Sequence, residues 1–115
     1  MGIVNIHLFL DDEWRAYEDA TVSTTTDMNF VVTTPDSKQI VYPFDAVKSV
    51  VVTGGSGSGA ETVKVNYATG PSSHRLFENV DLFWWDDWVF IEQGTGRDIL
   101  AGYRKDHVKS IEINP

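Results

Sequence analysis

The 115-residue chain contains no cysteine. Disulfide bonds, thiolate metal sites and cysteine nucleophiles are therefore excluded. Basic residues are also scarce, since 9 Lys and Arg stand against 17 Asp and Glu, for a formal net charge of −8. Because contact with nucleic-acid phosphates or with an anionic membrane needs a basic patch, we expect no direct nucleic-acid binding and no membrane docking. The acidic balance is compatible with ordinary solubility, with a basic protein partner, or with mimicry of DNA.

Long apolar runs are missing as well. No segment approaches the ~20 apolar residues that span a bilayer, and we expect no leader peptide ahead of the first strand. The lack of cysteine fits a reducing compartment. The expected location is therefore the cytoplasm.

Motifs for catalysis and for cofactor binding are absent too. The glycine-rich loop at 54–59 lacks the Lys-Ser/Thr end of a phosphate loop and leads into a predicted strand rather than a helix. His7, His74 and His107 lie on separate predicted elements, without the spacing of a metal site. We expect no enzyme activity, no cofactor and no metal.

Two acidic clusters have both a functional and a structural interpretation. Residues 11–13 read Asp-Asp-Glu, and Asp86 is followed by Asp87. They could bind a divalent cation, or supply a carboxylate pair for glycoside cleavage. The favoured interpretation is a helix cap for the first cluster and a hairpin or bulge for the second.

β-Branched and aromatic residues are what the chain has in quantity, and they favour strands. The length suits one domain covering residues 1–115. One short helix is predicted over 11–20, with Trp14 and Tyr17 on one side at helical spacing. Residues 22–27 read as an edge strand or a loop. Apolar patterning predicts strands over 3–10, 30–34, 39–42, 47–53, 62–67, 84–92, 98–103 and 108–113, and a short strand or an extended link over 74–80.

The sequence also contains an internal repeat. Asp45-Ala46-Val47-Lys48-Ser49-Val50 matches Asp106-His107-Val108-Lys109-Ser110-Ile111, and the hairpins that precede these segments have equal spacing, Phe30 to Ile40 and Val89 to Ile99. Each copy is a hairpin followed by a third strand, over residues 30–52 and 89–113. Two such units predict a mainly β fold, a small antiparallel barrel or sandwich.

The D-x-V-K-S run resembles an element of small β-domains in bacterial and phage proteins, including SH3-like and pleckstrin-homology-like barrels. The resemblance implies binding to proteins, peptides or further copies, with no shared catalytic residues. Because no closing helix is evident, an SH3-like or other small barrel is favoured. The whole chain also looks like an accessory phage protein, which would place it in the host cytoplasm.

The chain concentrates its apolar surface in residues 81–91, which hold three of its four tryptophans. Trp and Tyr are favoured interface anchors. We therefore expect a protein-interaction module that holds a partner or forms a dimer. The alternatives are a DNA-mimic inhibitor of a nucleic-acid-binding protein and a carbohydrate-binding module. The predicted partner-binding residues are Phe83, Trp84, Trp85, Asp86, Asp87, Trp14 and Tyr17.

Overall fold

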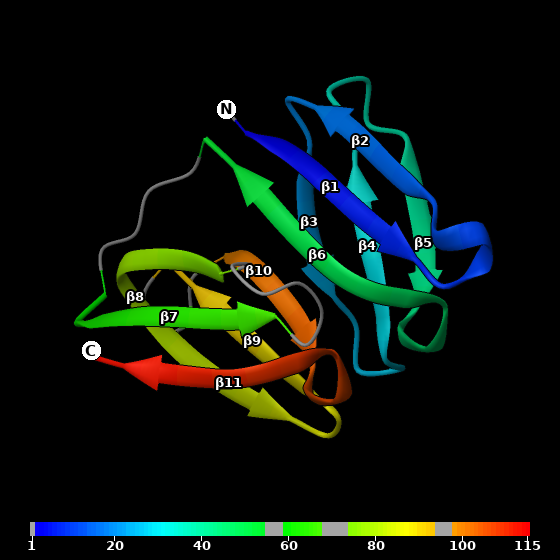
Figure 1. Cartoon of the computed structure of the whole chain (residues 1–115). Coiled ribbons are helices and arrows are strands. Elements are labelled where there is room, and N and C mark those ends of the chain that lie inside the picture. The colour runs from blue at the N-terminus through cyan, green and yellow to red at the C-terminus, as the bar shows by residue number, and fades with distance from the viewer. Residues whose placement is uncertain (1, 55–58, 68–73, 94–97) are drawn as a thin grey trace. The chain divides into compact units, whose positions relative to one another are not determined.

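The computed structural model describes residues 2–54, 59–67, 74–93 and 98–115. This part of the chain is mainly β, and its helical segments are 3-10 turns of three residues each. The predicted mainly β fold is therefore confirmed. The chain divides into two compact units, residues 1–55 (unit 1) and 56–115 (unit 2) (Figure 1).

The strands described in unit 1 are β1 (Ile3–Leu8), β2 (Trp14–Glu18), β3 (Thr21–Thr24), β4 (Asn29–Thr33), β5 (Gln39–Pro43) and β6 (Val47–Thr53). They form two antiparallel sheets. In one, β1 pairs with β2 on one side and with β6 on the other; in the second, β4 pairs with β3 and with β5. The 3-10 turn η1 (Leu10–Asp12) connects β1 to β2, and η2 (Phe44–Ala46) connects β5 to β6.

Alternating apolar residues from both sheets build the core of unit 1. Val4 and Ile6 are fully buried on β1, as are Phe30 and Val32 on β4. Phe44 of η2 packs on Phe30, with ring centroids 4.5 Å apart. Each fully buried side chain of this kind contributes about 1.5–3 kcal/mol. The period-2 pattern that predicted these strands therefore also sets the inward face of each one.

The predicted helix over 11–20 is wrong. Its first residues form η1, where Asp11 and Asp12 adopt positive φ values of 57° and 52°, and β2 begins at Trp14. A left-handed backbone is tolerated by Asp but cannot continue into an α-helix. Trp14 and Tyr17 therefore do not share a helical side. In strand geometry they point to opposite faces of β2.

The strands described in unit 2 are β7 (Glu61–Tyr67), β8 (His74–Trp85), β9 (Trp88–Glu92), β10 (Ile99–Arg104) and β11 (Val108–Ile113), with the 3-10 turn η3 (Lys105–His107) before β11. All neighbouring pairs are antiparallel, in the order β11-β7-β8-β9-β10. The twelve-residue β8 changes partner along its length. Its first half, up to Val80, pairs with β7, and residues 81–85 pair with β9.

The core of unit 2 follows the same alternation. Val63 and Val65 of β7 lie on the same face of the strand and are fully buried. Val89 and Ile91 of β9 are also fully buried, and so is Ala101 of β10. Phe77 of β8 and Tyr103 of β10 meet edge to face, with ring centroids 6.5 Å apart.

The glycine-rich loop predicted at 54–59 lies mostly outside the described residues. The sequence also predicts turns at 70–73 and 93–97; the first lies wholly, and the second mostly, outside the described residues. Within the described ranges, no helix has the length and apolar character that crossing a bilayer would require. The single domain over 1–115 stays a prediction.

Candidate interaction surface

The predicted aromatic segment forms the closed end of the β8–β9 hairpin. The expected continuous strand over 84–92 is wrong, because β8 ends at Trp85 and β9 begins at Trp88. Asp86 and Asp87 form the two-residue turn between them, and Asp86 has a φ of 54°. Asp accepts this left-handed conformation at a modest energetic cost, which makes it a common residue in tight hairpin turns. The aspartate pair therefore ends the strand, in line with its structural interpretation.

The hairpin register assigns the aromatic side chains to two faces. Phe83 lies opposite Phe90, and Trp85 lies opposite Trp88. Directly opposed residues share a face, so these four rings lie on one side of the hairpin. The ring centroid of Phe90 lies 6.4 Å from that of Phe83, 6.3 Å from that of Trp85 and 5.9 Å from that of Trp88.

Trp84 lies on the other face of β8, opposite Val89. Lys105 Nζ lies 5.7 Å from the centroid of its ring, within cation-π distance. The backbone N–H of Lys105 donates to the carbonyl of Asp87 at 2.8 Å. This hydrogen bond links the start of η3 to the turn and helps to place the lysine beside Trp84.

Burial separates these aromatic residues into a core group and a surface group. Trp88 and Phe90 are 1% and 2% exposed, and Trp85 is half-buried. Phe83 and Trp84 remain 49% and 52% exposed. The core group stabilises the hairpin, whereas the two exposed rings leave large apolar area in contact with solvent.

Gly102 of β10 explains how Phe90 is accommodated. It lies opposite Phe90 in the register, and a Cβ atom at this position would be 3.0 Å from Phe90 Cε1. Only a glycine leaves room for the ring against the β10 backbone. The backbone of β10 therefore supports the buried side of the aromatic cluster.

The β3–β4 hairpin of unit 1 has a pairing arrangement similar to that of the β8–β9 hairpin, but β3 carries no aromatic residue. Phe30 of β4 lies opposite Tyr42 and Thr24, as Val89 of β9 lies opposite Tyr103 and Trp84. Continuing along β3, Ser23 corresponds to Phe83. The two registered positions on β3 therefore carry polar residues where β8 carries two large rings.

The two other predicted site residues lie in unit 1. Trp14 is 55% exposed and stacks on His7, with ring centroids 4.0 Å apart and planes 10° from parallel. Tyr17 is half-buried, and its hydroxyl is hydrogen-bonded to that of Tyr42 on β5. Burial, together with this bond, raises the pKa of Tyr42 to about 12. Tyr17 thus joins the two sheets of unit 1, while Trp14 presents a free face to solvent.

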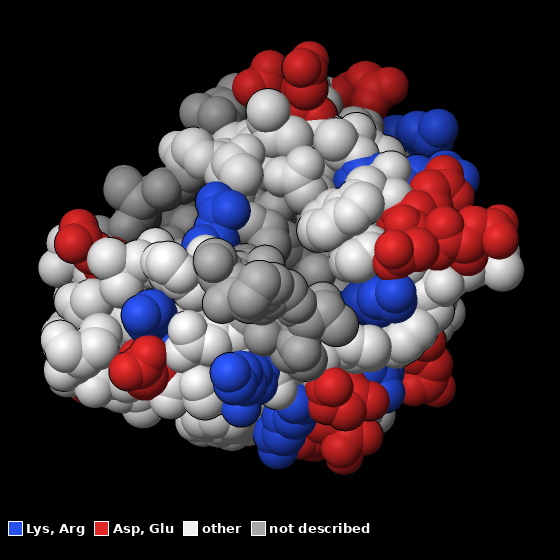
Figure 2. Space-filling model, viewed as in Figure 1, with Lys and Arg blue, Asp and Glu red and all other residues white. Residues whose placement is uncertain are grey.

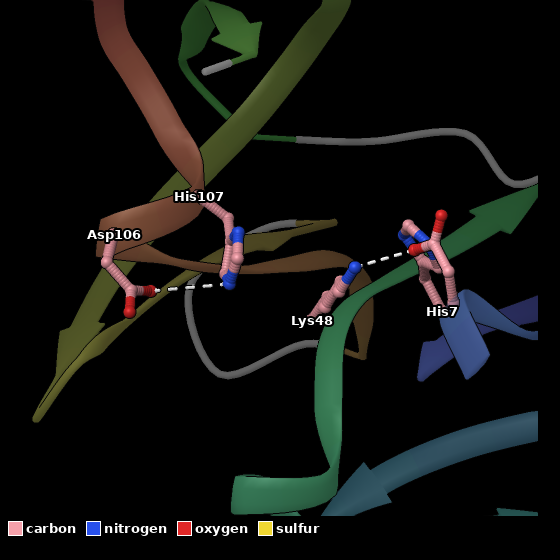
Figure 3. A network of polar contacts seen from close by, with 5 residues as sticks. His7, Lys48, Asp106 and His107 are labelled. Carbon is pink, nitrogen blue, oxygen red and sulfur yellow. Dashed lines mark hydrogen bonds and ion pairs between the residues drawn. The ribbon is translucent and has the colours of Figure 1, made fainter. Parts of the chain in front are cut away.

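A polar network around Asp12 was missed by sequence reasoning. Its carboxylate accepts a hydrogen bond from Lys48 Nζ at 2.6 Å and lies 2.6 Å from His7 Nε2. Hydrogen bonds from Lys48 and His7 hold the pKa of Asp12 below its ordinary value. Figure 3 shows the ion pair of Lys48, and separately the 3.9 Å ion pair between Asp106 and His107 in unit 2.

Among the described residues, no group of three or more His, Cys, Asp or Glu side chains could hold a metal ion. The network could not be found from sequence, because a helix at 11–20 would have directed Asp12 away from β1 and β6. The network connects Asp12, in the turn between β1 and β2, to His7 on β1 and to Lys48 on β6.

Comparison of the chain with protein-family models, with curated proteins and with solved structures gives no match.

Proposed function

We propose that the protein is a non-enzymatic interaction module that holds a protein partner, or a second copy of itself, through the closed end of the β8–β9 hairpin. The contact residues are Phe83, Trp84, Trp85, Asp86 and Asp87, referred to below as the aromatic tip. One observation carries the proposal: Phe83 and Trp84 are half exposed where unit 1 has Ser23 and Thr24. Exposed rings that the fold does not require are typical of contact surfaces.

The charge of the aromatic tip favours a basic partner. Asp86 and Asp87 are both exposed at the turn, beside the two exposed rings. Interfaces commonly place aromatic anchors at the centre and charged residues at the rim. The rim charges would speed association and make it salt-dependent, while the rings would supply most of the affinity.

Two other functions have less support. A DNA mimic needs unpaired carboxylates spread over one face, but Asp12 pairs with Lys48 and Glu13 with Arg15 within unit 1, and Figure 2 shows Lys and Arg beside acidic side chains. A carbohydrate-binding platform needs exposed rings on a common face. Phe83 and Trp84 instead lie on opposite faces of β8. A protein partner can contact both faces at once.

We also infer that the two units are copies of one repeat, longer than the predicted 30–52 and 89–113. Support comes from their equivalent pairings: β1 lies between β2 and β6 as β7 lies between β8 and β11. The N–H of Phe44 donates to the carbonyl of Met28, as Lys105 does to Asp87. The SH3-like barrel, the phage origin and the cytoplasmic location rest on the sequence alone.

Affinity capture from lysate of the native host tests the proposed function. The three baits are the wild type, the double variant F83S/W84T, and Leu76→Thr as a matched control. Leu76 is 51% exposed on the same strand but lies outside the aromatic tip. The double variant installs the residues found at the matching positions of unit 1.

We expect a protein, or the chain itself, to be retained by the wild type and by Leu76→Thr and to be lost with F83S/W84T. Sedimentation velocity of the three purified proteins shows whether that partner is a second copy. Identical retention by all three baits, with identical sedimentation, would exclude the aromatic tip as the contact.

A further inference from the structure

The aromatic tip lies on a strand edge without a described neighbour. Residues 81–85 of β8 pair with β9, and β7 pairs only with the part of β8 up to Val80. Among the described residues, no strand is registered against the other side of Leu82, Phe83 or Trp84. Unpaired edges of this kind are sites where another strand can add to a sheet.

The hairpin register identifies which backbone groups are presented at this edge. Trp85 and Trp88 flank the two-residue turn, so this pair exchanges the ladder hydrogen bonds next to it. Bonded and non-bonded pairs alternate along an antiparallel ladder. The pairs of Trp84 with Val89 and of Leu82 with Ile91 are therefore non-bonded. The N–H and C=O groups of Leu82 and Trp84 consequently point away from β9.

We propose that this edge binds an extended segment of a partner protein, which pairs with Leu82 to Trp84 as an added antiparallel strand. The proposal rests on the proposed function and gives its binding mode. Main-chain hydrogen bonds to Leu82 and Trp84 supply affinity, and side chains on either face of the added strand meet Phe83 or Trp84. Phe83 and Trp84 are half exposed on opposite faces of β8, so a flat ligand cannot contact both. An added strand has side chains on both of its faces and can contact both rings.

The charge around the edge selects the chemistry of that strand. Asp86 and Asp87 are exposed at one end of the 82–84 segment, and the chain as a whole carries a net charge of −8. A second copy paired through the same edge would bring two strongly acidic surfaces together. Lys105, beside Trp84, offsets only part of this charge. The occupant is therefore a strand of another protein with β-branched residues and Lys or Arg.

Amide hydrogen exchange of the wild type, followed by NMR, tests the binding mode. The probe is a heptapeptide of alternating valine and lysine, and the control is the same peptide with glutamate in place of lysine. We expect the lysine peptide to slow exchange at the Leu82 and Trp84 amides by roughly tenfold at saturation. The glutamate peptide should have no effect.

Unit 1 supplies an internal control. Val22 and Thr24 occupy the matching positions on β3, which is also an edge strand of its sheet, but their neighbour Ser23 offers no ring. Their exchange should not change. The proposal would be overturned by a lysine peptide that leaves Leu82 and Trp84 unprotected, by equal binding of both peptides, or by equal protection of Val22 and Thr24.

A second variant separates this proposal from the proposed function. Leu82→Pro removes an outward N–H that the β8–β9 ladder does not use, while both exposed rings remain. With folding verified by NMR, it should lose the lysine peptide and the captured partner. If Leu82→Pro retains the partner while F83S/W84T loses it, the aromatic tip binds in another way and strand addition is wrong. If Leu82→Pro does not fold, the exchange result on the wild type decides.

Discussion

Trp84 and Val89 face each other across the β8–β9 hairpin, yet Val89 is fully buried and Trp84 is 52% exposed. The matching pair in unit 1 is Thr24 and Phe30, where the buried partner is again apolar but the opposing residue is polar. In both units the buried position thus carries an apolar side chain that stabilises the core. The position facing it can be polar, so its tryptophan in unit 2 needs an explanation other than folding.

The F83S/W84T variant should remain folded. Because both rings are only half buried, the free energy of unfolding should fall by about 1–3 kcal/mol in total. Trp88→Ala, in the same hairpin but buried, should cost about 3–5 kcal/mol. Urea denaturation of both variants checks this. A loss of several kcal/mol from F83S/W84T would assign the two rings to the core.

Gly102→Ala should destabilise unit 2. The added Cβ would lie 3.0 Å from Phe90 Cε1, so the ring must shift within a packed cluster. Overpacking of this kind costs about 1–3 kcal/mol. The cost should shrink in a Phe90→Leu background, because the smaller side chain leaves room. A stabilising Gly102→Ala, as expected for an unstrained glycine in a strand, would show that the contact is unimportant.

Tyr17→Phe should alter the titration of Tyr42. Burial and the hydrogen bond with Tyr17 raise the pKa of Tyr42 to about 12 from an ordinary 10.0. The folded state therefore retains this proton longer than the unfolded state, and stability falls as the pH rises from about 10 to about 12. Removing the Tyr17 hydroxyl should lower the pKa of Tyr42 and cost about 1 kcal/mol at neutral pH.

Absorbance of ionised tyrosine, measured from pH 9 to pH 13, follows this change. An unchanged titration of Tyr42 in Tyr17→Phe would contradict the bond between Tyr17 and Tyr42.

Asp12→Asn should lose stability at neutral pH but not in acid. Lys48 and His7 hold the pKa of Asp12 below its ordinary value of 3.8. The stabilisation is therefore present above 3.8 and is lost as the pH falls through the lower pKa of the folded state. Thermal unfolding at pH 7 and in strong acid checks the difference.

Much of the fold was predictable from local patterns. The alternation of Val63 and Val65, or of Phe30 and Val32, is typical of strands, and these segments do form β7 and β4. The segment 11–20 was not predictable, because Trp14 and Tyr17 suit a helix by spacing and a strand by composition. Pairing with β1 decides in favour of the strand: Trp14 lies opposite His7 in the β1–β2 register. Sequence spacing does not report that pairing.

The candidate site was predictable as a region but not residue by residue. Composition identified residues 83–87, and the aspartate pair was recognised as a possible hairpin. Two facts decide which ring is exposed: the turn at Asp86 and Asp87, and the glycine at 102 that admits Phe90. The turn makes Trp88 the first residue of β9 rather than a continuation of β8. The effect of Gly102 on Phe90 follows only from the β9–β10 register, in which the two residues are opposite each other. Neither can be derived from the alternation along a single strand.

The most direct test of the central claim is tryptophan-specific oxidative labelling of the free protein and of the captured complex. Trp84 and Trp14 are similarly exposed, at 52% and 55%, and Trp88 is buried, so the free protein should be labelled at the first two and not at the third. Labelling of Trp14 reports independently on the other predicted contact in unit 1. We predict that labelling of Trp84 falls severalfold in the complex. Equal labelling of Trp84 in the free and bound protein would contradict the account.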